Sequence, residues 1–448
     1  MSKNSSSNLG TQPIGKLIIA QSIPAAIGIL VMSLNMLIDT IFVGNWIGVH
    51  AISAITIVLP ISFLIASVGM AIGIGGSSII SRALGKGNGN KVDLVFGNQI
   101  TLSLGLSIIF TTVGLYYTDA ALQLFGASGA VIEPARAYYT VVMYGVPFLS
   151  LVMTGNPIIR AEGRPTFSMI ALIVPAVVNI ALDYYFIVYL DLGINGAAWA
   201  TTLAYFSSFL FILWFFFSKN SELSFKLKYI RLNLPIVKEI GALGGITLAR
   251  QGVISILSII LNHSLVMYGG EIALAVYGII SRMLMFALFP VMGITQGFMP
   301  IAGYNYGADN FERLKETMVK SITYATVLAV VIFIVIMVFP TEIVSMFTQD
   351  EAILKLTPNA LRIVFAVTPL IAIQLIGSAY FQAIGKVRPA LLLTLTKQGF
   401  FLIPLILILP HYFGLFGIWV SFPIADFLAT GLTAYFLYKE LKQYLNTK

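Results

Sequence analysis

Long runs of apolar residues recur along the whole 448-residue chain. A helix needs about 20 mostly apolar residues to cross the hydrocarbon core of a bilayer, and most of the runs reach that length. Short stretches rich in Gly, Asn, Pro and charged residues separate them. We therefore predict an all-α integral membrane protein with twelve spanning helices, at approximately residues 15–43, 51–82, 93–118, 136–159, 166–190, 195–218, 235–268, 272–303, 315–339, 358–384, 389–410 and 414–438.

The composition supports a membrane protein and excludes several kinds of site. Hydrophobic residues make up 58% of the chain and charged residues 10%, whereas about 25% of a typical soluble domain is charged. The absence of cysteine excludes disulfides, iron–sulfur clusters and Cys-ligated zinc. Because only three histidines are present, we expect no cofactor and no metal beyond a coupling Na⁺. The polar segment 1–16 is expected to be a disordered tail and lacks the pattern of a signal peptide.

The charged residues predict the orientation of the spans. If the N-terminus is cytoplasmic, most of the 26 Lys and Arg fall in cytoplasmic loops, and acidic residues gather in the outer loops. We therefore expect a multi-pass protein of the cell (inner) membrane with both termini in the cytoplasm. The net charge of +8 is then a topology signal, and we expect no nucleic-acid partner.

The two halves of the sequence resemble each other at a nearly constant offset. The matching positions are Pro147 with Pro369, Gly85 with Gly307 and Gly163 with Gly385, each 222 residues apart, and Gly193 with Gly414, 221 apart. Because the offset contains six spans, the halves face the same way and form a pseudo-two-fold parallel repeat. Such repeats are typical of transporters that work by alternating access about a central site.

The repeat divides the chain into five segments. We predict a cytoplasmic tail at 1–14, an N-lobe at 15–218 with helices 1–6, and a cytoplasmic linker at 219–234. A C-lobe at 235–438 with helices 7–12 and a second cytoplasmic tail at 439–448 complete the chain.

Two stretches of sequence resemble the MATE (multidrug and toxic compound extrusion) transporters. They are Asn35–Gly44 (NMLIDTIFVG) and Gly293–Ala308 (GITQGFMPIAGYNYGA), and the similarity extends over essentially all twelve spans. The resemblance implies two six-helix lobes and a secondary antiporter, not an enzyme, that exports small organic compounds against an inward H⁺ or Na⁺ gradient. No Walker-type phosphate-binding motif is present. We expect a monomer in the lipid bilayer.

Two acidic residues lie well inside the predicted spans of the first half. Asp39 in helix 1 and Asp183 in helix 5 fall within about one turn of the same depth. Thr201 of helix 6 reaches a similar level. Asn35 and Asn179 each lie one turn from an acid on the same helix face. Ionisable residues inside a membrane are costly and by default indicate function.

This set of side chains suits a proton or a small hard cation. Burial and a like-charged neighbour both favour the protonated form of a carboxyl group, and oxygen ligands equally suit Na⁺. In the DinF-like, archaeal-type branch of the family, Asp39, Asp183, Asn179 and Thr201 match positions of the cation-coupling network, and Pro24 resembles a proline at which helix 1 bends. The plainer alternative is that the acids only hydrogen bond neighbouring helices and that Pro24 is a static kink.

The second half carries mainly basic residues inside its spans. Arg250, Arg282 and Lys397 accompany a single acid, Asp426. They form either a polar wall that contacts substrate or an internal ion-pair network. The NorM branch of the family carries acids in this lobe for a sodium site, so this chain departs from that pattern. We therefore expect cation coupling in the N-lobe.

Aromatic residues and methionines could line an adaptable substrate cavity. The candidate coupling or cavity residues are Asn35, Tyr139, Asn156, Met32, Met36 and Met153, with Phe286 and Met292 in the C-lobe. Asn35 and Asn156 could equally join helices by hydrogen bonds.

Three other functions remain open. A flippase for lipid-linked saccharides or peptidoglycan precursors would share the lobe plan and would favour a cationic cavity, which the C-lobe cations allow. A facilitator of the sugar-transporter type would carry a basic G-x-x-x-D-[RK] loop, but residues 84–90 read LGKGNGN. A structural or enzymatic membrane protein would show no dependence on an ion gradient.

Overall fold

The computed structural model describes residues 5–445, and over this range it is helical with no strand. Residues 1–4 and 446–448 of the predicted tails lie outside the described residues. Ten helices of the described chain are long and apolar enough to cross a membrane. Two of them break at a glycine with a left-handed φ, Gly270 at 66° and Gly414 at 57°, and so provide two spans each. The predicted all-α fold with twelve spans is confirmed.

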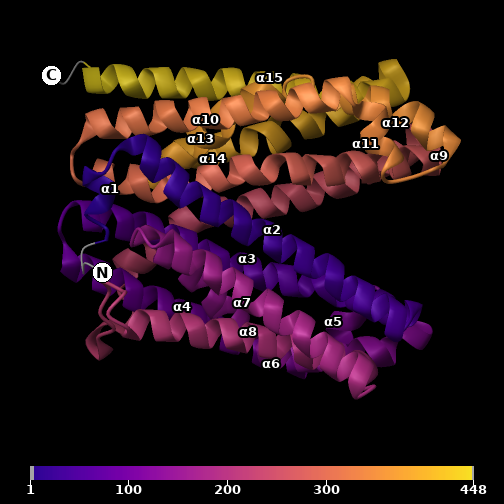
Figure 1. The fold of residues 1–448 in the computed structure, drawn as a ribbon, viewed down its shortest axis with the longest axis horizontal. Helices are drawn as coiled ribbons and strands as arrows, with labels where there is room; N and C mark the ends of the chain where they lie inside the picture. Colours follow the sequence, from indigo (N-terminus) through magenta and orange to yellow (C-terminus); the bar gives the residue numbers. More distant parts are fainter. Residues whose placement is uncertain (1–4, 446–448) are drawn as a thin grey trace. The chain divides into compact units, whose positions relative to one another are not determined.

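The spans fall close to the predicted ranges (Figure 1). Those of the first half are α2 (Ile14–Trp46), α3 (Val49–Gly85), α4 (Gly89–Tyr116), α6 (Ile132–Ala161), α7 (Pro165–Asp183) with the π-helix η2 (Tyr184–Tyr189), and α8 (Gly193–Phe217). Those of the second half are the two parts of α9 (Leu234–Gly307), α10 (Phe311–Val338), α12 (Glu351–Val364) with η4 (Thr368–Leu370) and α13 (Ile371–Ala383), and α14 (Val387–Leu395) with the π-helix η5 (Thr396–Leu402) and the two parts of α15 (Ile403–Leu445).

Short helices lie between the spans and were not predicted. They are α1 (Asn8–Thr11), α5 (Thr118–Leu124), η1 (Gly129–Val131), η3 (Leu227–Tyr229) and α11 (Pro340–Ser345). The helices α5 and α11 begin 222 residues apart and so occupy equivalent places in the two halves.

The repeat is visible in the backbone as well as in the sequence. Asn88 and Asn310 cap α4 and α10 with the same geometry, each side chain accepting a hydrogen bond from the backbone N–H three residues later. The glycines Gly163 and Gly385 end their helices with positive φ angles of 72° and 83°. Equivalent turns are therefore built from equivalent residues.

The chain packs into two units whose boundaries cut through α2 and α9. Unit 1 contains the chain up to Thr11 and Ile27–Thr247, and unit 2 contains Gln12–Ala26 and the chain from Leu248 onward. The first part of α2 thus packs with the second half of the sequence, and the first part of α9 packs with the first half. The predicted lobes followed the order of the spans, whereas these units follow packing.

Glycines explain how these two helix segments are held. In unit 2, a Cβ on Gly297 would come within 2.6 Å of the Ser22 hydroxyl oxygen. In unit 1, a Cβ on Gly75 would overlap the backbone at Ile240 and Gly244. Gly297 follows Gly75 by 222 residues, and Gly244 follows Ser22 by the same interval. Both contacts need a residue without a side chain because the backbones approach closely.

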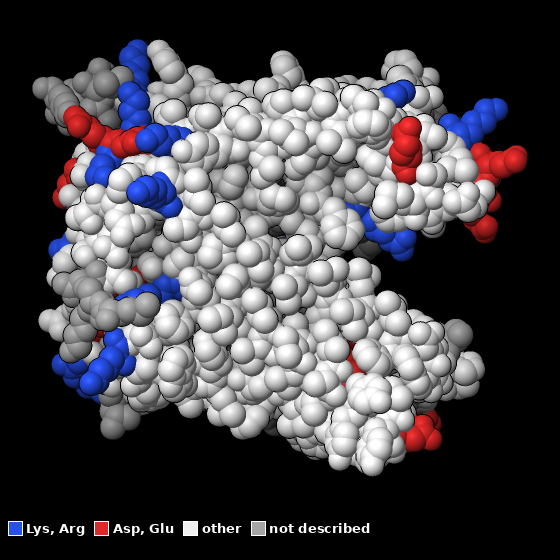
Figure 2. Space-filling view, viewed as in Figure 1, with Lys and Arg blue, Asp and Glu red and all other residues white. Residues whose placement is uncertain are grey.

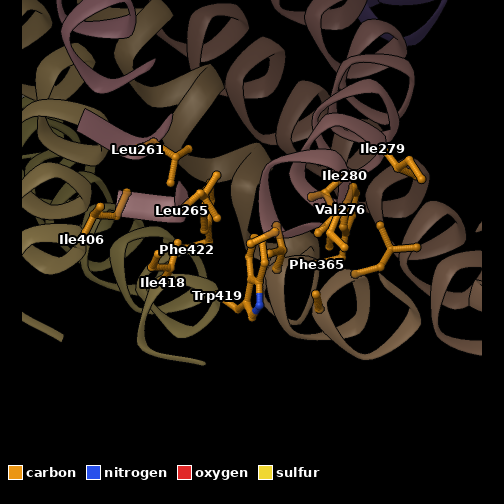
Figure 3. Packing of buried hydrophobic residues seen from close by; sticks show 14 of the residues in the cluster. Leu261, Leu265, Val276, Ile279, Ile280, Phe365, Ile406, Ile418, Trp419 and Phe422 are labelled. Atoms are coloured by element: carbon orange, nitrogen blue, oxygen red, sulfur yellow. The ribbon is translucent and has the colours of Figure 1, made fainter. Parts of the chain in front are cut away.

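Apolar packing fills the interior of unit 2. Leu261, Leu265, Phe365 and Phe422 belong to one buried cluster that joins α9, α12 and α15 (Figure 3). The face drawn in Figure 2 consists mainly of uncharged residues, and many of its Lys and Arg gather near the helix ends. This pattern is typical of helices that face lipid.

The N-terminal segment differs from the expected disordered tail. Leu9 is buried, and Ser5 donates a hydrogen bond of 2.8 Å from its hydroxyl to the backbone oxygen of Glu162. Ser6 donates from its backbone N–H and its hydroxyl to the Glu222 carboxylate. The prediction of disorder is wrong for residues 5–11, because their polar groups find partners that the local sequence does not reveal.

Candidate functional site

Two pairs of polar side chains connect α2 with α7 inside unit 1. Asn35 donates a hydrogen bond of 3.0 Å from Nδ2 to Oδ1 of Asn179. One turn further along both helices, the carboxyl groups of Asp39 and Asp183 lie within hydrogen-bonding range of each other. Asp183 is fully buried and Asn179 nearly so. The structure thus brings together two acids that are 144 positions apart in the sequence.

The acids are short of hydrogen-bond donors. Within the described part of the chain, no N–H or O–H group donates to either carboxylate oxygen of Asp183 or to Oδ1 of Asp39. Oδ1 of Asn35 also accepts no hydrogen bond there. Two carboxylates cannot hydrogen bond each other without a proton between them. The cluster therefore calls for a positive charge, either a proton or a bound cation.

Three hydroxyl groups complete the surroundings of the acids. Tyr138 of α6 lies close to Thr201 of α8 and is near enough to Asp39 and Asp183 to feel their charge. Tyr205, one turn after Thr201, is also within electrostatic range of Asp39. Thr201 therefore neighbours a tyrosine that lies near the acids, and its role in cation coupling stays a prediction. Tyr138 and Tyr205 were missed.

Neighbouring tyrosines explain why Tyr138 was missed. Sequence reasoning named Tyr139, whose hydroxyl instead donates to the backbone oxygen of Gly114 in α4 at 3.2 Å. Adjacent residues on a helix point about 100° apart, so only one of the two can face α2. The i, i+4 spacing of Thr201 and Tyr205 was the available signal, because it places both hydroxyls on one face of α8.

The backbone is irregular where the buried charges lie. The π-helix η2 begins directly after Asp183, and Leu190 donates to the Tyr185 oxygen at 3.0 Å, five residues back. In unit 2, Lys397 lies inside the second π-helix, η5. Short π-helical segments occur frequently at functional sites, where they redirect side chains. Neither π-helix was predicted from the sequence.

The C-lobe charges only partly form a network. Lys397 and Asp426 make a buried ion pair, with Nζ 2.5 Å from Oδ1. Arg250 is partly buried in α9 and Arg282 is exposed. Over the described range, neither arginine forms an ion pair. An ion pair therefore accounts for Lys397 and Asp426 and leaves the two arginines available to other groups.

The other predicted residues lie in different surroundings. Asn156 makes two hydrogen bonds with Ser168 and so joins α6 to α7. Nδ2 of Asn156 donates to the backbone oxygen of Ser168 at 2.7 Å, and Oδ1 of Asn156 accepts from the Ser168 hydroxyl at 2.9 Å. Met153 packs against a small apolar cluster of the same helices. Four of the predicted residues have exposed side chains on α2 or α9, namely Met32, Met36, Phe286 and Met292. None of these placements tests a cavity role, which stays a prediction.

Pro24 lies inside α2, two residues before the position at which this helix passes from unit 2 to unit 1. A proline within a helix removes one backbone hydrogen bond and weakens that turn. The weak turn thus lies where one helix joins two packing units. Between Pro24 and Asp39 the helix continues through Asn35.

We also searched the described residues for groups that could hold a metal ion. The described residues contain no cluster of three or more His, Asp or Glu side chains that could hold a metal ion. The carboxylate and amide oxygens around Asp39 suit a proton or a monovalent hard cation.

Comparison with known proteins identifies the family to which the chain belongs. The MatE family model matches the chain twice, at residues 24–185 and 248–408, once in each half. The multidrug export protein MepA of Staphylococcus haemolyticus is 30% identical over 417 residues, covering 93% of this chain and 92% of that protein. MepA of Staphylococcus aureus (strain N315) is 29% identical over 416 residues, covering 93% of this chain and 92% of that protein.

Solved structures agree with these sequence matches. A crystal structure of MATE in the bent conformation superposes with a TM-score of 0.93 at 28% identity, covering 99% of this chain and 98% of that one. An outward-facing conformation of a multidrug resistance MATE family transporter gives 0.90 at 28% identity, covering 100% and 99%. With its internal repeat, its spans and its two matches to the family model, the chain belongs to the MatE family of multi-pass membrane transporters.

Proposed function

We propose that this transporter is a secondary antiporter that exports amphipathic organic compounds, driven by H⁺ or Na⁺ entering at the Asp39–Asp183 pair. The observation that carries the proposal is the set of buried carboxylate oxygens of Asp39 and Asp183 to which no described N–H or O–H group donates. A site of this kind is favourable only when a positive charge occupies it. Occupancy by a coupling cation is the function that such a site supports.

The arrangement of helices supports a coupled movement. Asp39 belongs to the part of α2 that packs in unit 1, whereas the segment before Pro24 packs in unit 2. Charging or neutralising the acids changes the attraction between α2 and α7, since only a proton or cation holds the two carboxylates together. The weak turn at Pro24 allows one part of α2 to respond without the other.

The proposal includes the finer predictions from the sequence. Both termini are placed in the cytoplasm of the inner membrane, with the acids in the outer half of the bilayer. On the basis of the acidic pair we also propose that the chain belongs to the DinF-like, archaeal-type branch and acts as a monomer without a cofactor. The multidrug export relatives support drugs and related organic compounds as substrates.

The test is efflux from proteoliposomes under an imposed pH gradient or an imposed Na⁺ gradient. A fluorescent amphipathic cation such as ethidium is the substrate probe. Asp39→Asn and Asp183→Asn remove the negative charge and keep the shape of the side chain. We expect each variant to lose at least tenfold of the gradient-driven rate, and the ion that drives the wild type identifies the coupling cation.

Asp191→Asn is the matched control. Asp191 is an exposed acid eight positions after Asp183, with a φ of 50° that asparagine also adopts. This variant should keep the wild-type rate and the wild-type response to the gradient. Unchanged coupling in both Asp39→Asn and Asp183→Asn would rule out the assignment of the cation site.

A further inference from the structure

The segment that joins α8 to α9 combines positive charge with exposed apolar side chains. Residues 225–234 read FKLKYIRLNL, in which three basic residues are interspersed among apolar ones. Exposed basic residues of the wider segment 219–238 include Lys226, Lys228, Arg231 and Lys238. Ile230, Leu232 and Leu234 are exposed as well, at 40%, 51% and 63%. We call residues 219–238 the connecting segment.

The connecting segment is held in place by the first turns of α4. Asp93 accepts a hydrogen bond of 2.9 Å from the backbone N–H of Ser224 and pairs with Lys226. Asn98 accepts a hydrogen bond of 2.7 Å from the backbone N–H of Asn233. Because these contacts involve the backbone, the segment has a defined path and its exposed side chains are presented outward.

The path of the segment follows α4 towards the membrane interior and returns. Ser224 is bonded at the level of Asp93, and Ile230 is bonded through its backbone oxygen to the Thr101 hydroxyl at 3.0 Å. Asn233 then returns to the level of Asn98. Residues 230–232 therefore form the tip of a loop, about 12 Å further along α4 than its start.

The tip lies at the level beyond which α4 has no charged or amide side chain. The amides Asn98 and Gln99 precede a stretch from Ile100 to Tyr116 that contains only apolar, glycine and hydroxyl residues. This stretch is about 25 Å long, close to the thickness of the hydrocarbon core. The exposed side chains of Ile230 and Leu232 are thus at the edge of the hydrocarbon, and the cations earlier in the loop are at the level of the lipid headgroups.

We propose that the connecting segment is a docking site for anionic phospholipids. Its lysines and arginine bind the headgroup phosphates, and Ile230 and Leu232 contact the start of the acyl chains. Cations next to a membrane surface attract anionic lipids by about 1 kcal/mol each, or about fivefold in affinity. Exposed apolar side chains beside them add attraction that a soluble phosphate cannot provide.

The first test is lipid binding to the detergent-solubilised full-length protein by native mass spectrometry. The probes are phosphatidylglycerol and phosphatidylcholine with the same acyl chains. The triple variant Lys228→Gln, Arg231→Gln, Lys238→Gln changes cations that form no ion pair within the described chain. We expect the wild type to prefer phosphatidylglycerol and the triple variant to lose at least tenfold of this preference.

A second triple variant controls for overall charge. Lys86→Gln, Lys315→Gln and Lys439→Gln also remove three exposed cations, all from loops or helix ends outside the connecting segment. These changes should leave most of the preference intact. Equal losses in the two triple variants, or no loss in either, would overturn the docking site.

A site-specific measurement checks the depth of the tip independently of charge. The chain has no cysteine, so Ile230→Cys provides a single attachment point for a fluorophore. In vesicles that contain phosphatidylglycerol with brominated acyl chains, we expect strong quenching at position 230. A label on Ser224→Cys, at the base of the loop, should be quenched several-fold less, and equal quenching at the two positions would contradict the proposed depth.

Discussion

The same place in the two halves of this transporter contains opposite chemistry. The residues 222 positions after Asp39 and Asp183 are Leu261 and Leu405. Leu261 is fully buried in the apolar cluster of unit 2 (Figure 3). Leu405 packs against the same cluster. One half therefore uses this position for a charged site and the other uses it for apolar packing.

A second difference between the halves lies where α3 meets α4 in the first half and where α9 meets α10 in the second. In unit 1, Gln99 donates to the backbone oxygens of Ile72 and Gly73, at 2.8 and 3.2 Å, and its amide occupies the space beside Gly76. The residues 222 positions after Gly76 and Gln99 are Phe298 and Ser321, both fully buried. The first half places the large residue on the second of the two helices, and the second half places it on the first. The space between the paired helices is therefore filled in both halves.

These differences show what a repeat has to preserve. The turns, caps and close glycine contacts recur because they determine how helices meet. The buried acids of the first half do not recur, because a second unpaired acid in an apolar cluster would cost several kcal/mol. Four predictions test this comparison.

The largest effect is expected from copying the acid into the second half. Leu261→Asp places a carboxyl group among apolar side chains that offer it no donor, which costs about 3–5 kcal/mol. We expect a low yield and a large drop in the thermal unfolding temperature. Leu261→Met, which keeps the volume, should cost less than about 1.5 kcal/mol. Equal stability of the two variants would show that this position tolerates charge.

The next effect concerns the ion pair of unit 2. Lys397→Met leaves Asp426 buried without its partner and should cost about 3 kcal/mol in stability. The double variant Lys397→Met, Asp426→Leu removes both charges and should recover most of the loss. Arg282→Gln, at an exposed cation, is the control and should unfold like the wild type. Failure of the double variant to recover would assign these residues a role other than pairing.

A smaller effect is expected where volumes are exchanged between the halves. Gly76→Ala adds a methyl group that overlaps the Gln99 amide, so it should cost about 1–3 kcal/mol despite the better helix propensity of alanine. Gln99→Ser, the residue of the second half, should relieve the overlap in the double variant. The two changes are expected to be strongly non-additive in thermal unfolding, and simple additivity would contradict the exchange.

The last prediction concerns the pH dependence of stability and the loop after α6. Burial raises the pKa of Glu162 to about 8, although its carboxylate accepts hydrogen bonds from Ser221 and the Glu222 backbone. A carboxyl whose pKa is higher when folded stabilises the protein below its unfolded pKa, and this stabilisation is lost as the pH rises to about 8. The thermal stability of the wild type should therefore fall as the pH rises from 5 to 9.

Glu162→Gln keeps the acceptor oxygen and removes the titration, so its stability should depend less on pH. The equivalent residue of the second half, 222 positions later, is the buried Ile384, which cannot titrate. A pH dependence that is equally steep in the variant would place the titrating group elsewhere.

Much of the fold could be predicted because the length of an apolar run is a local property. The break at Gly270 lies in the predicted gap 269–271, and the break at Gly414 comes directly after the predicted gap 411–413. The repeat follows from glycine and proline spacing. The packing units could not be predicted. A uniformly apolar helix gives no periodic signal for the face that meets another helix, since lipid is as apolar as a protein interior.

The candidate site also has features that the sequence predicts and features that only the structure reveals. The sequence alone identified Asp39, Asp183, Asn179 and Thr201, because polar residues inside apolar runs are costly and therefore conspicuous. Only the tertiary structure decided that the two acids meet, that Tyr138 faces them in place of Tyr139, and that Lys397 pairs with Asp426. These choices depend on the rotation of each helix about its axis, which is set by contacts between residues far apart in the chain.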